Sequence, residues 1–200
     1  LGRKYLSICR RYDKEIAHVQ SQWASTQAAQ GIRYPKSSKH LLKLYKRKKN
    51  SIWDYLHKLT RYLVDYCQKE GIHTVVTGDV TGIRKGKDLG NRTNQKLHGL
   101  PYAKIYTMLE YKLSLYGIRF VKQTESYTSQ CSPFSKEVSK GCAVKTNRCM
   151  RGLYKDGAVI FQADAVGAYN ILRKYFAVSG NKQKLSVSGL SDPKIIKVAV

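Results

Sequence analysis

Three acidic side chains stand where predicted strands end, an arrangement suited to binding a metal ion. Asp79 ends the run HTVVTGD, Glu125 lies at the end of IRFVKQTES, and Asp164 opens the segment after AVIFQ. If these strands share one sheet, the carboxylates lie along one edge of it. Mg²⁺ is held by one or two carboxylates with waters and phosphate oxygens, and a pair of such ions can activate water and stabilise the leaving oxygen in phosphodiester cleavage. The pattern therefore predicts a Mg²⁺ site made by these three acids.

Each acid also has a simpler explanation. Asp79 can stabilise a turn by hydrogen bonding to its own backbone, and Asp164 can cap the N-terminus of its helix. Glu125 can be an exposed charge at the end of a strand. The residues alone leave both interpretations open.

The elements before these acids are predicted to be two long helices. Apolar residues recur every three or four positions over residues 5–23, which is typical of an amphipathic helix. The segment GIRYPKSS interrupts the pattern, and Ser37 or Ser38 can cap a second helix that ends at Gly71. Residues 1–70 are therefore predicted to form a basic helical hairpin.

From residue 71 onward the pattern becomes α/β. HTVVTGD is a β-branched run that predicts a short buried strand, IRFVKQTES alternates in the manner of a strand, and a helix from Pro101 to Tyr116 is predicted between them. AVIFQ predicts another strand, ADAVGAYNILRKYF a helix, and KIIKVAV one short strand in a weakly ordered tail. The predicted divisions are 71–126 and 158–176 for the two α/β parts, 127–157 for an insertion between them, and 177–200 for the tail.

The charge of the chain indicates a polyanionic partner. Lys and Arg number 37 against 13 acids, a net charge of +24, so nucleic acid is the favoured partner. The run KLYKRKK on the second helix is the densest basic stretch, although it can also be a solvated helix face. The side chains predicted to contact phosphates are Lys43, Lys46, Arg47, Lys48 and Lys49 on this helix, and Arg84, Lys85 and Lys87 in the loop after the first strand.

No apolar run approaches the ~20 residues of a membrane-spanning helix, and no signal peptide is recognisable. The five cysteines, an odd number without a secretory context, indicate reduced thiols. We expect a cytoplasmic, nucleoid-associated protein that does not bind membranes.

The segments VVTGDVTGIRKGKDLGN, IRFVKQTESYTSQCSP and ADAVGAYNILRKY together resemble the carboxyl-terminal half of TnpB proteins. These are the transposon-encoded OrfB "transposases" ancestral to compact CRISPR effector nucleases, and the resemblance covers roughly residues 1–176. It implies an RNase H-like RuvC nuclease that is interrupted by a zinc ribbon and guided by RNA to cut DNA. The expected fold class is thus α/β, a partial RuvC fold preceded by the basic hairpin, with a zinc-ribbon-like insertion.

The resemblance also implies roles for individual residues. Asp164 in ADAVGAYNI matches the last of three Mg²⁺-binding acids. Family members commonly read V-x-E-D-L where this chain reads VTGD, so Gly78 takes the place of the glutamate. In members with this G-D form, a glutamate before T-S-x-x-C is implied to replace it, which here is Glu125, with Asp79 as a substitute or supporting ligand. The first acid, in a G-x-D-x-G context, would lie upstream of Leu1.

The implied zinc ribbon departs from the family pattern, which has two C-x-x-C pairs. Residues 127–157 offer Cys131, Cys142 and Cys149, without a C-x-x-C pair or any histidine after His98, whereas Zn²⁺ requires four ligands. We expect no bound zinc. Instead, RGLYKDGAVIF predicts a hairpin with KDG as its turn, which would hold the insertion together.

Two functions follow. The first is an RNA-guided, Mg²⁺-dependent RuvC-type DNA endonuclease of which this chain is a truncated, carboxyl-terminal portion. The second is a catalytically inactive remnant that still binds RNA or DNA. The missing first acid favours weak metal binding and little cutting by the isolated chain. A basic RNA-binding protein unrelated to transposons is a third, weaker hypothesis.

Overall fold

The computed structural model describes residues 2–82, 90, 99–150, 152–181, 183 and 185–193. These residues form two compact units, one reaching Asp65 and one beginning at Tyr66, so the division falls inside the second long helix. The finer divisions of the α/β part stay predictions. Within the described residues, no helix is both long and apolar enough to cross a lipid bilayer.

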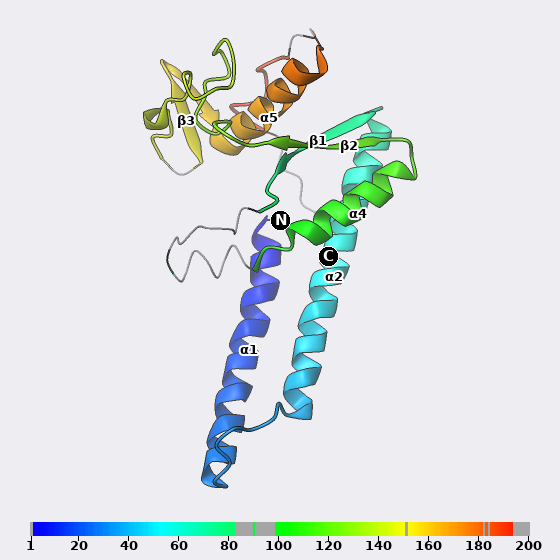
Figure 1. The fold of residues 1–200 in the computed structure, drawn as a ribbon, viewed down its shortest axis with the longest axis vertical. Coiled ribbons are helices and arrows are strands. Elements are labelled where there is room, and N and C mark those ends of the chain that lie inside the picture. Colours follow the sequence, from blue (N-terminus) through cyan, green and yellow to red (C-terminus); the bar gives the residue numbers. More distant parts are fainter. Residues whose placement is uncertain are drawn as a thin grey trace. The chain divides into compact units, whose positions relative to one another are not determined.

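The first unit is the predicted helical hairpin. Helices α1 (Gly2–Ala29) and α2 (Lys39–Lys69) run antiparallel, with α2 continuing into the second unit (Figure 1). Their shared core contains Tyr12 and Ile16 from α1 and Leu41 and Leu44 from α2, all buried. Apolar residues that recur every three or four positions form one buried stripe on each helix, which is why the sequence pattern located both helices.

The predicted start and end of α2 are confirmed. The hydroxyl of Ser38 accepts a hydrogen bond from the backbone N–H of Leu41 (3.1 Å), as an N-cap residue does. Gly71 follows the helix with φ of +63°, a conformation that favours glycine, and the N–H of Ile72 donates to the carbonyl of Cys67 (2.8 Å).

The second unit contains a parallel pair of strands. Strands β1 (Thr74–Asp79) and β2 (Arg119–Thr124) pair from Thr74↔Arg119 to Asp79↔Thr124, and helix α4 (Tyr102–Ser114) connects them (Figure 1). Parallel strands require such a crossover, and both strands and the helix lie where the sequence predicted them. Because the pairing is parallel, the carboxyl ends of both strands meet at one edge.

The insertion ends in the predicted hairpin. A 3₁₀ turn, η1 (Lys145–Asn147), precedes strands β3 (Leu153–Asp156) and β4 (Val159–Gln162), which pair antiparallel around a turn at Gly157, where φ is +60°. Helix α5 (Ala163–Ser179) follows directly and packs against both pairs of strands.

The tail differs from the expectation of a weakly ordered appendage. Helix α5 extends to Ser179, and Leu190 is buried in a core cluster with Tyr154, Phe161 and Val166. The carbonyl of Leu190 also accepts a hydrogen bond from the N–H of Gln162 (2.8 Å). An isolated leucine among polar residues has no period, so its contact could not be seen in the sequence. The predicted strand KIIKVAV lies outside the described residues.

Candidate functional site

The carboxylate of Glu125 lies over the backbone of Gly78. Glu125 follows β2 directly, and the last paired residues of the two strands are Asp79 and Thr124. A Cβ atom added to Gly78 would lie 1.7 Å from Oε1 and 2.3 Å from Cδ of Glu125. A side chain at position 78 would therefore force the side chain of Glu125 to move, and glycine allows this close approach. The carboxylate of Glu125 occupies the space that a side chain of residue 78 would fill.

Tyr106 of α4 fixes the end of β1. Its hydroxyl donates a hydrogen bond to the carbonyl of Gly78 (2.5 Å) and accepts one from the N–H of Val80 (3.1 Å). Burial raises the pKa of Tyr106, and the negative charges of Glu125 and Asp79 raise it further. The strand register pairs Asp79 with Thr124, the residue before Glu125, so Glu125 and Asp79 lie at the same edge.

Asp79 makes the turn that its sequence context allowed. Its Oδ1 accepts a hydrogen bond from the backbone N–H of Thr81 (2.8 Å). Hydrogen bonds from Thr81 lower the pKa of Asp79, and the ammonium of Lys122 adds to the effect. Lys122 Nζ also lies 5.0 Å from the centroid of the Tyr106 ring. The exposed carboxylate of Asp79 is thus kept ionised at the edge.

Asp164 does not cap its helix. The cap of α5 is Gln162, whose Oε1 accepts a hydrogen bond from the N–H of Ala165 (2.6 Å). The side-chain amide of Gln162 also donates to Oδ2 of Asp164 (3.3 Å). The capping explanation for Asp164 is therefore wrong, because the neighbouring glutamine performs that role. Asp164 stays exposed in the first turn of α5, where a negative charge is favourable.

The donors at this edge fit Mg²⁺ in type. In the described parts of the chain, no three side chains of His, Cys, Asp or Glu converge closely enough to hold a metal ion. Glu125 and Asp79 lie at the ends of two paired strands, whereas Asp164 lies on α5, which packs against β1 and β2. Mg²⁺ prefers oxygen donors and needs only one or two protein carboxylates.

The cysteines of the insertion do not fit Zn²⁺. Cys131 is buried and its thiol donates to the carbonyl of Ser139 (3.3 Å). Burial raises the pKa of the Cys131 thiol. In the described residues, no three side chains of His, Cys, Asp or Glu converge to hold a metal ion, whereas Zn²⁺ requires four ligands. Cys149 is exposed, and the position three residues after Cys131, where a C-x-x-C pair would place its second cysteine, is Phe134. Cys142 is the remaining thiol, half-buried.

Two residues of α5 that sequence reasoning missed hold the Cys131 loop instead. Asn170 is fully buried, and its amide donates to the carbonyls of Thr128 and Cys131, each at 2.8 Å. The guanidinium of Arg173 donates to the carbonyls of Ser132 (3.0 Å) and Ser135, and to Oδ1 of Asn170 (3.0 Å). An Asn and an Arg three positions apart on a helix that is otherwise mostly apolar were the available signal.

The basic run of α2 is largely exposed. Lys43, Lys46, Arg47 and Lys49 are exposed, but Lys48 is half-buried and its Nζ lies 2.5 Å from Oδ1 of Asp13. Lys48 is therefore ion-paired within the hairpin rather than presented to a ligand. The predicted phosphate contacts Arg84, Lys85 and Lys87 lie outside the described residues.

Comparisons with known proteins find two matching family models and two similar relatives. The sequence model of the OrfB_IS605 family, described as a probable transposase, matches residues 1–84, and that of a Cas12f1-like TNB domain matches residues 102–171. A TnpB-like protein of Methanocaldococcus jannaschii is 25% identical over 142 residues, covering 70% of this chain and 49% of the relative. The CRISPR-associated endodeoxyribonuclease Cas12f1 of Sulfoacidibacillus thermotolerans is 32% identical over 117 residues, covering 58% and 25%.

A solved structure has a similar fold. The chain superposes on the protein of a Cas12f1–sgRNA–target DNA complex with a TM-score of 0.51 and 18% identity, covering 80% of this chain and 42% of the other. The chain spans about half the length of the TnpB-like relative and a quarter of the Cas12f1 relative. The two family models match separate segments of the chain, and the relatives are a TnpB-like protein and a Cas12f1 nuclease, so the comparisons together support a protein similar to the TnpB family.

Proposed function

We propose that the chain contributes the metal-binding edge of an RNA-guided, Mg²⁺-dependent DNA endonuclease with a RuvC-type site. The observation that supports this most is the carboxylate of Glu125 over Gly78, which supplies an acid at a strand position that has no side chain of its own. A relative named as an endodeoxyribonuclease and a similar structure bound to sgRNA and target DNA support the choice of guide RNA and DNA as partners.

In this proposal Glu125, Asp79 and Asp164 are the residues that would hold Mg²⁺. The ion, when bound, would activate water and stabilise the leaving oxygen of the phosphodiester. The chain's own residues prepare the edge. Tyr106 holds the carbonyl of Gly78 and the N–H of Val80 in place, and Thr81 keeps Asp79 ionised.

The exposed basic side chains of α2 are proposed to contact the phosphate backbone. Each phosphate that a Lys or Arg neutralises releases counterions, so this contact makes binding depend on salt. Lys43, Lys46, Arg47 and Lys49 are available for it, whereas Lys48 already pairs with Asp13.

A second candidate function is nucleic-acid binding without cleavage. The support for this candidate is that the paired strand ends carry two acids, Glu125 and Asp79. A two-ion hydrolytic site depends on additional carboxylates that bridge its cations. The chain by itself is then expected to bind Mg²⁺ weakly and to leave DNA uncut.

The test compares Mg²⁺ binding and DNA nicking among variants of the whole chain in the presence of guide RNA. Glu125→Gln and Asp164→Asn should each weaken Mg²⁺ binding measured by calorimetry. Glu110→Gln removes the same charge from an exposed position on α4 and serves as the matched control. Unchanged Mg²⁺ binding in both site variants would refute the metal site. Mg²⁺ binding without plasmid nicking would select the second candidate.

A further inference from the structure

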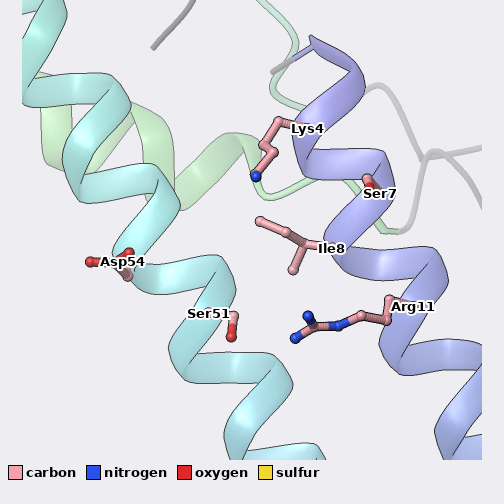
Figure 2. A pocket seen from close by; sticks show the side chains of 6 residues that line it. All are labelled: Lys4, Ser7, Ile8, Arg11, Ser51 and Asp54. Atoms are coloured by element: carbon pink, nitrogen blue, oxygen red, sulfur yellow. The ribbon is translucent and has the colours of Figure 1, made fainter. Parts of the chain in front are cut away.

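The helical hairpin contains a pocket whose lining includes none of the basic residues of the α2 run. It lies between α1 and α2 and has a volume of about 240 Å³. Since one water takes about 30 Å³ of liquid, the pocket has room for several groups of that size. Its lining, shown in Figure 2, consists of Lys4, Ser7, Ile8 and Arg11 from α1 and Ser51 and Asp54 from α2.

The spacing of these residues places them on facing helix surfaces. The α1 residues are separated by three, four and seven positions, which puts them on one face of the helix, and the α2 residues are three apart. Lys4 and Arg11 extend from α1 toward α2, so that the ammonium and the guanidinium point into the space between the helices (Figure 2). Ile8 lies between them and adds an apolar side chain to the lining (Figure 2).

The lining has a net positive charge. The ion pairs of the described residues do not include Lys4 or Arg11. The carboxylate of Asp54 already pairs with the ammonium of Lys58 on its own helix, at 2.9 Å. Two cations therefore face a carboxylate that is largely neutralised.

Arg11 is held in position by the core of the hairpin. Its Cζ lies 4.7 Å from the centroid of the Tyr12 ring, and cation–π contact of this kind orients a guanidinium. Tyr12 is itself buried, and its hydroxyl lies 3.0 Å from the hydroxyl of Ser51 across the hairpin. The guanidinium thus loses little conformational freedom when it binds a ligand.

We infer that this pocket binds a phosphodiester group of a nucleic acid, a second backbone contact in addition to the basic run of α2. The planar guanidinium of Arg11 suits two oxygens of a phosphate, and Lys4 supplies a point charge to the same group. The hydroxyl of Ser7 can donate a further hydrogen bond from the same face. The inference rests on the proposed function, because it requires that the chain binds nucleic acid.

Arginine protection by bound oligonucleotide tests the inference, and the chain supplies its own control. Arg10 and Arg11 are adjacent and both exposed, but Arg11 alone lines the pocket. The whole chain is labelled with phenylglyoxal, with and without oligonucleotide, and the modified arginines are quantified by mass spectrometry. Bound oligonucleotide should protect Arg11 several-fold more than Arg10. Parallel arms with single-stranded RNA, single-stranded DNA and duplex DNA identify which backbone enters the pocket.

A salt titration gives an independent readout. Lys4→Gln/Arg11→Gln should lower the slope of log affinity against log salt by about 0.7 for single strands or about 0.9 for duplex DNA, the value for one lost phosphate contact. The control pair Arg10→Gln/Lys14→Gln removes the same charge from exposed positions of the same helix outside the pocket and should change the slope less. Asp54→Asn should strengthen binding.

The outcomes separate this inference from the proposed function. Equal protection of Arg10 and Arg11, or equal slopes for the two double variants, would refute the pocket while nucleic-acid binding stands. Failure of every oligonucleotide to bind the wild-type chain at low salt would refute the proposed function itself.

Discussion

Truncating the buried amide of Asn170 should strongly destabilise the second unit. This side chain is fully buried, donates to the carbonyls of Thr128 and Cys131 at 2.8 Å each, and accepts from Arg173 at 3.0 Å. Asn170→Ala leaves two carbonyls without their donors. A buried polar group without a partner costs roughly 1–3 kcal/mol, so we expect a loss of about 2–4 kcal/mol. The total free energy of unfolding of a typical protein is only about 5–15 kcal/mol, so this loss is a large part of it.

The two units can be followed separately in one experiment. The chain has 2 tryptophans, Trp23 and Trp53, and both lie in the first unit. Tryptophan fluorescence in urea therefore follows unfolding of the hairpin, and the midpoint of that transition should be the same in Asn170→Ala as in the wild-type chain. Hydrogen exchange of the amides of residues 128–135, measured by mass spectrometry, follows the second unit. A loss of about 3 kcal/mol should accelerate that exchange roughly a hundredfold if these amides exchange through opening of the whole unit.

Two further variants decide the interpretation. Lys174→Ala is the matched control on the same helix, because its ammonium makes one exposed contact, to the carbonyl of Ser126 at 3.3 Å, and its loss should cost less than about 0.5 kcal/mol. Asn170→Asp keeps the shape of the side chain but replaces the donors by an acceptor, so it should destabilise at least as much as alanine. Exchange in Asn170→Ala that matches Lys174→Ala would refute the reasoning.

Three other outcomes are expected. Tyr106→Phe removes both hydrogen bonds to the end of β1, so it should lower the free energy of urea unfolding by about 1–2 kcal/mol and weaken Mg²⁺ binding. Tyr111→Phe, on the exposed face of the same helix, is the control and should have neither effect. Hydrogen bonds from Thr81 lower the pKa of Asp79. The ionised carboxylate should therefore stabilise the turn at pH values above the ordinary carboxyl range, and this stabilisation should disappear as the pH falls through the lowered pKa. A ¹³C NMR titration of the Asp79 carboxyl measures that pKa. Cys131, whose pKa burial raises, should react with iodoacetamide far more slowly than exposed Cys149 until urea unfolds the chain.

The elements that depend on local patterns could be predicted from the sequence. Apolar spacing located both long helices, and Ser38 and Gly71 marked the start and end of α2 because capping depends on neighbouring residues. A β-branched run located β1, and an alternating pattern located β2. These signals are contained within a few residues, so no knowledge of the tertiary fold was required.

What depends on distant contacts could not be predicted. In the sequence, Lys48 is indistinguishable from the other cations of the basic run, because only the packing of the hairpin brings it to Asp13. Intrinsic preference favoured Asp164 as the helix cap, yet the glutamine before the helix takes that position and leaves the acid exposed. The contact of Glu125 with Gly78 required the register of two strands whose paired residues are 45 positions apart in the sequence.

The close approach of Glu125 to Gly78 also constrains the order in which the two codons can change. A Cβ at position 78 would lie 1.7 Å from Oε1, so a larger residue cannot enter while the glutamate keeps its conformation. Shortening the glutamate first leaves the strand edge without that carboxylate. Each single step is therefore unfavourable although the double exchange preserves one acid, which is the condition for sign epistasis. In a library randomised at both codons, surviving sequences should pair a small residue at one position with an acid at the other, and libraries randomised at one codon alone would not recover the exchanged pair.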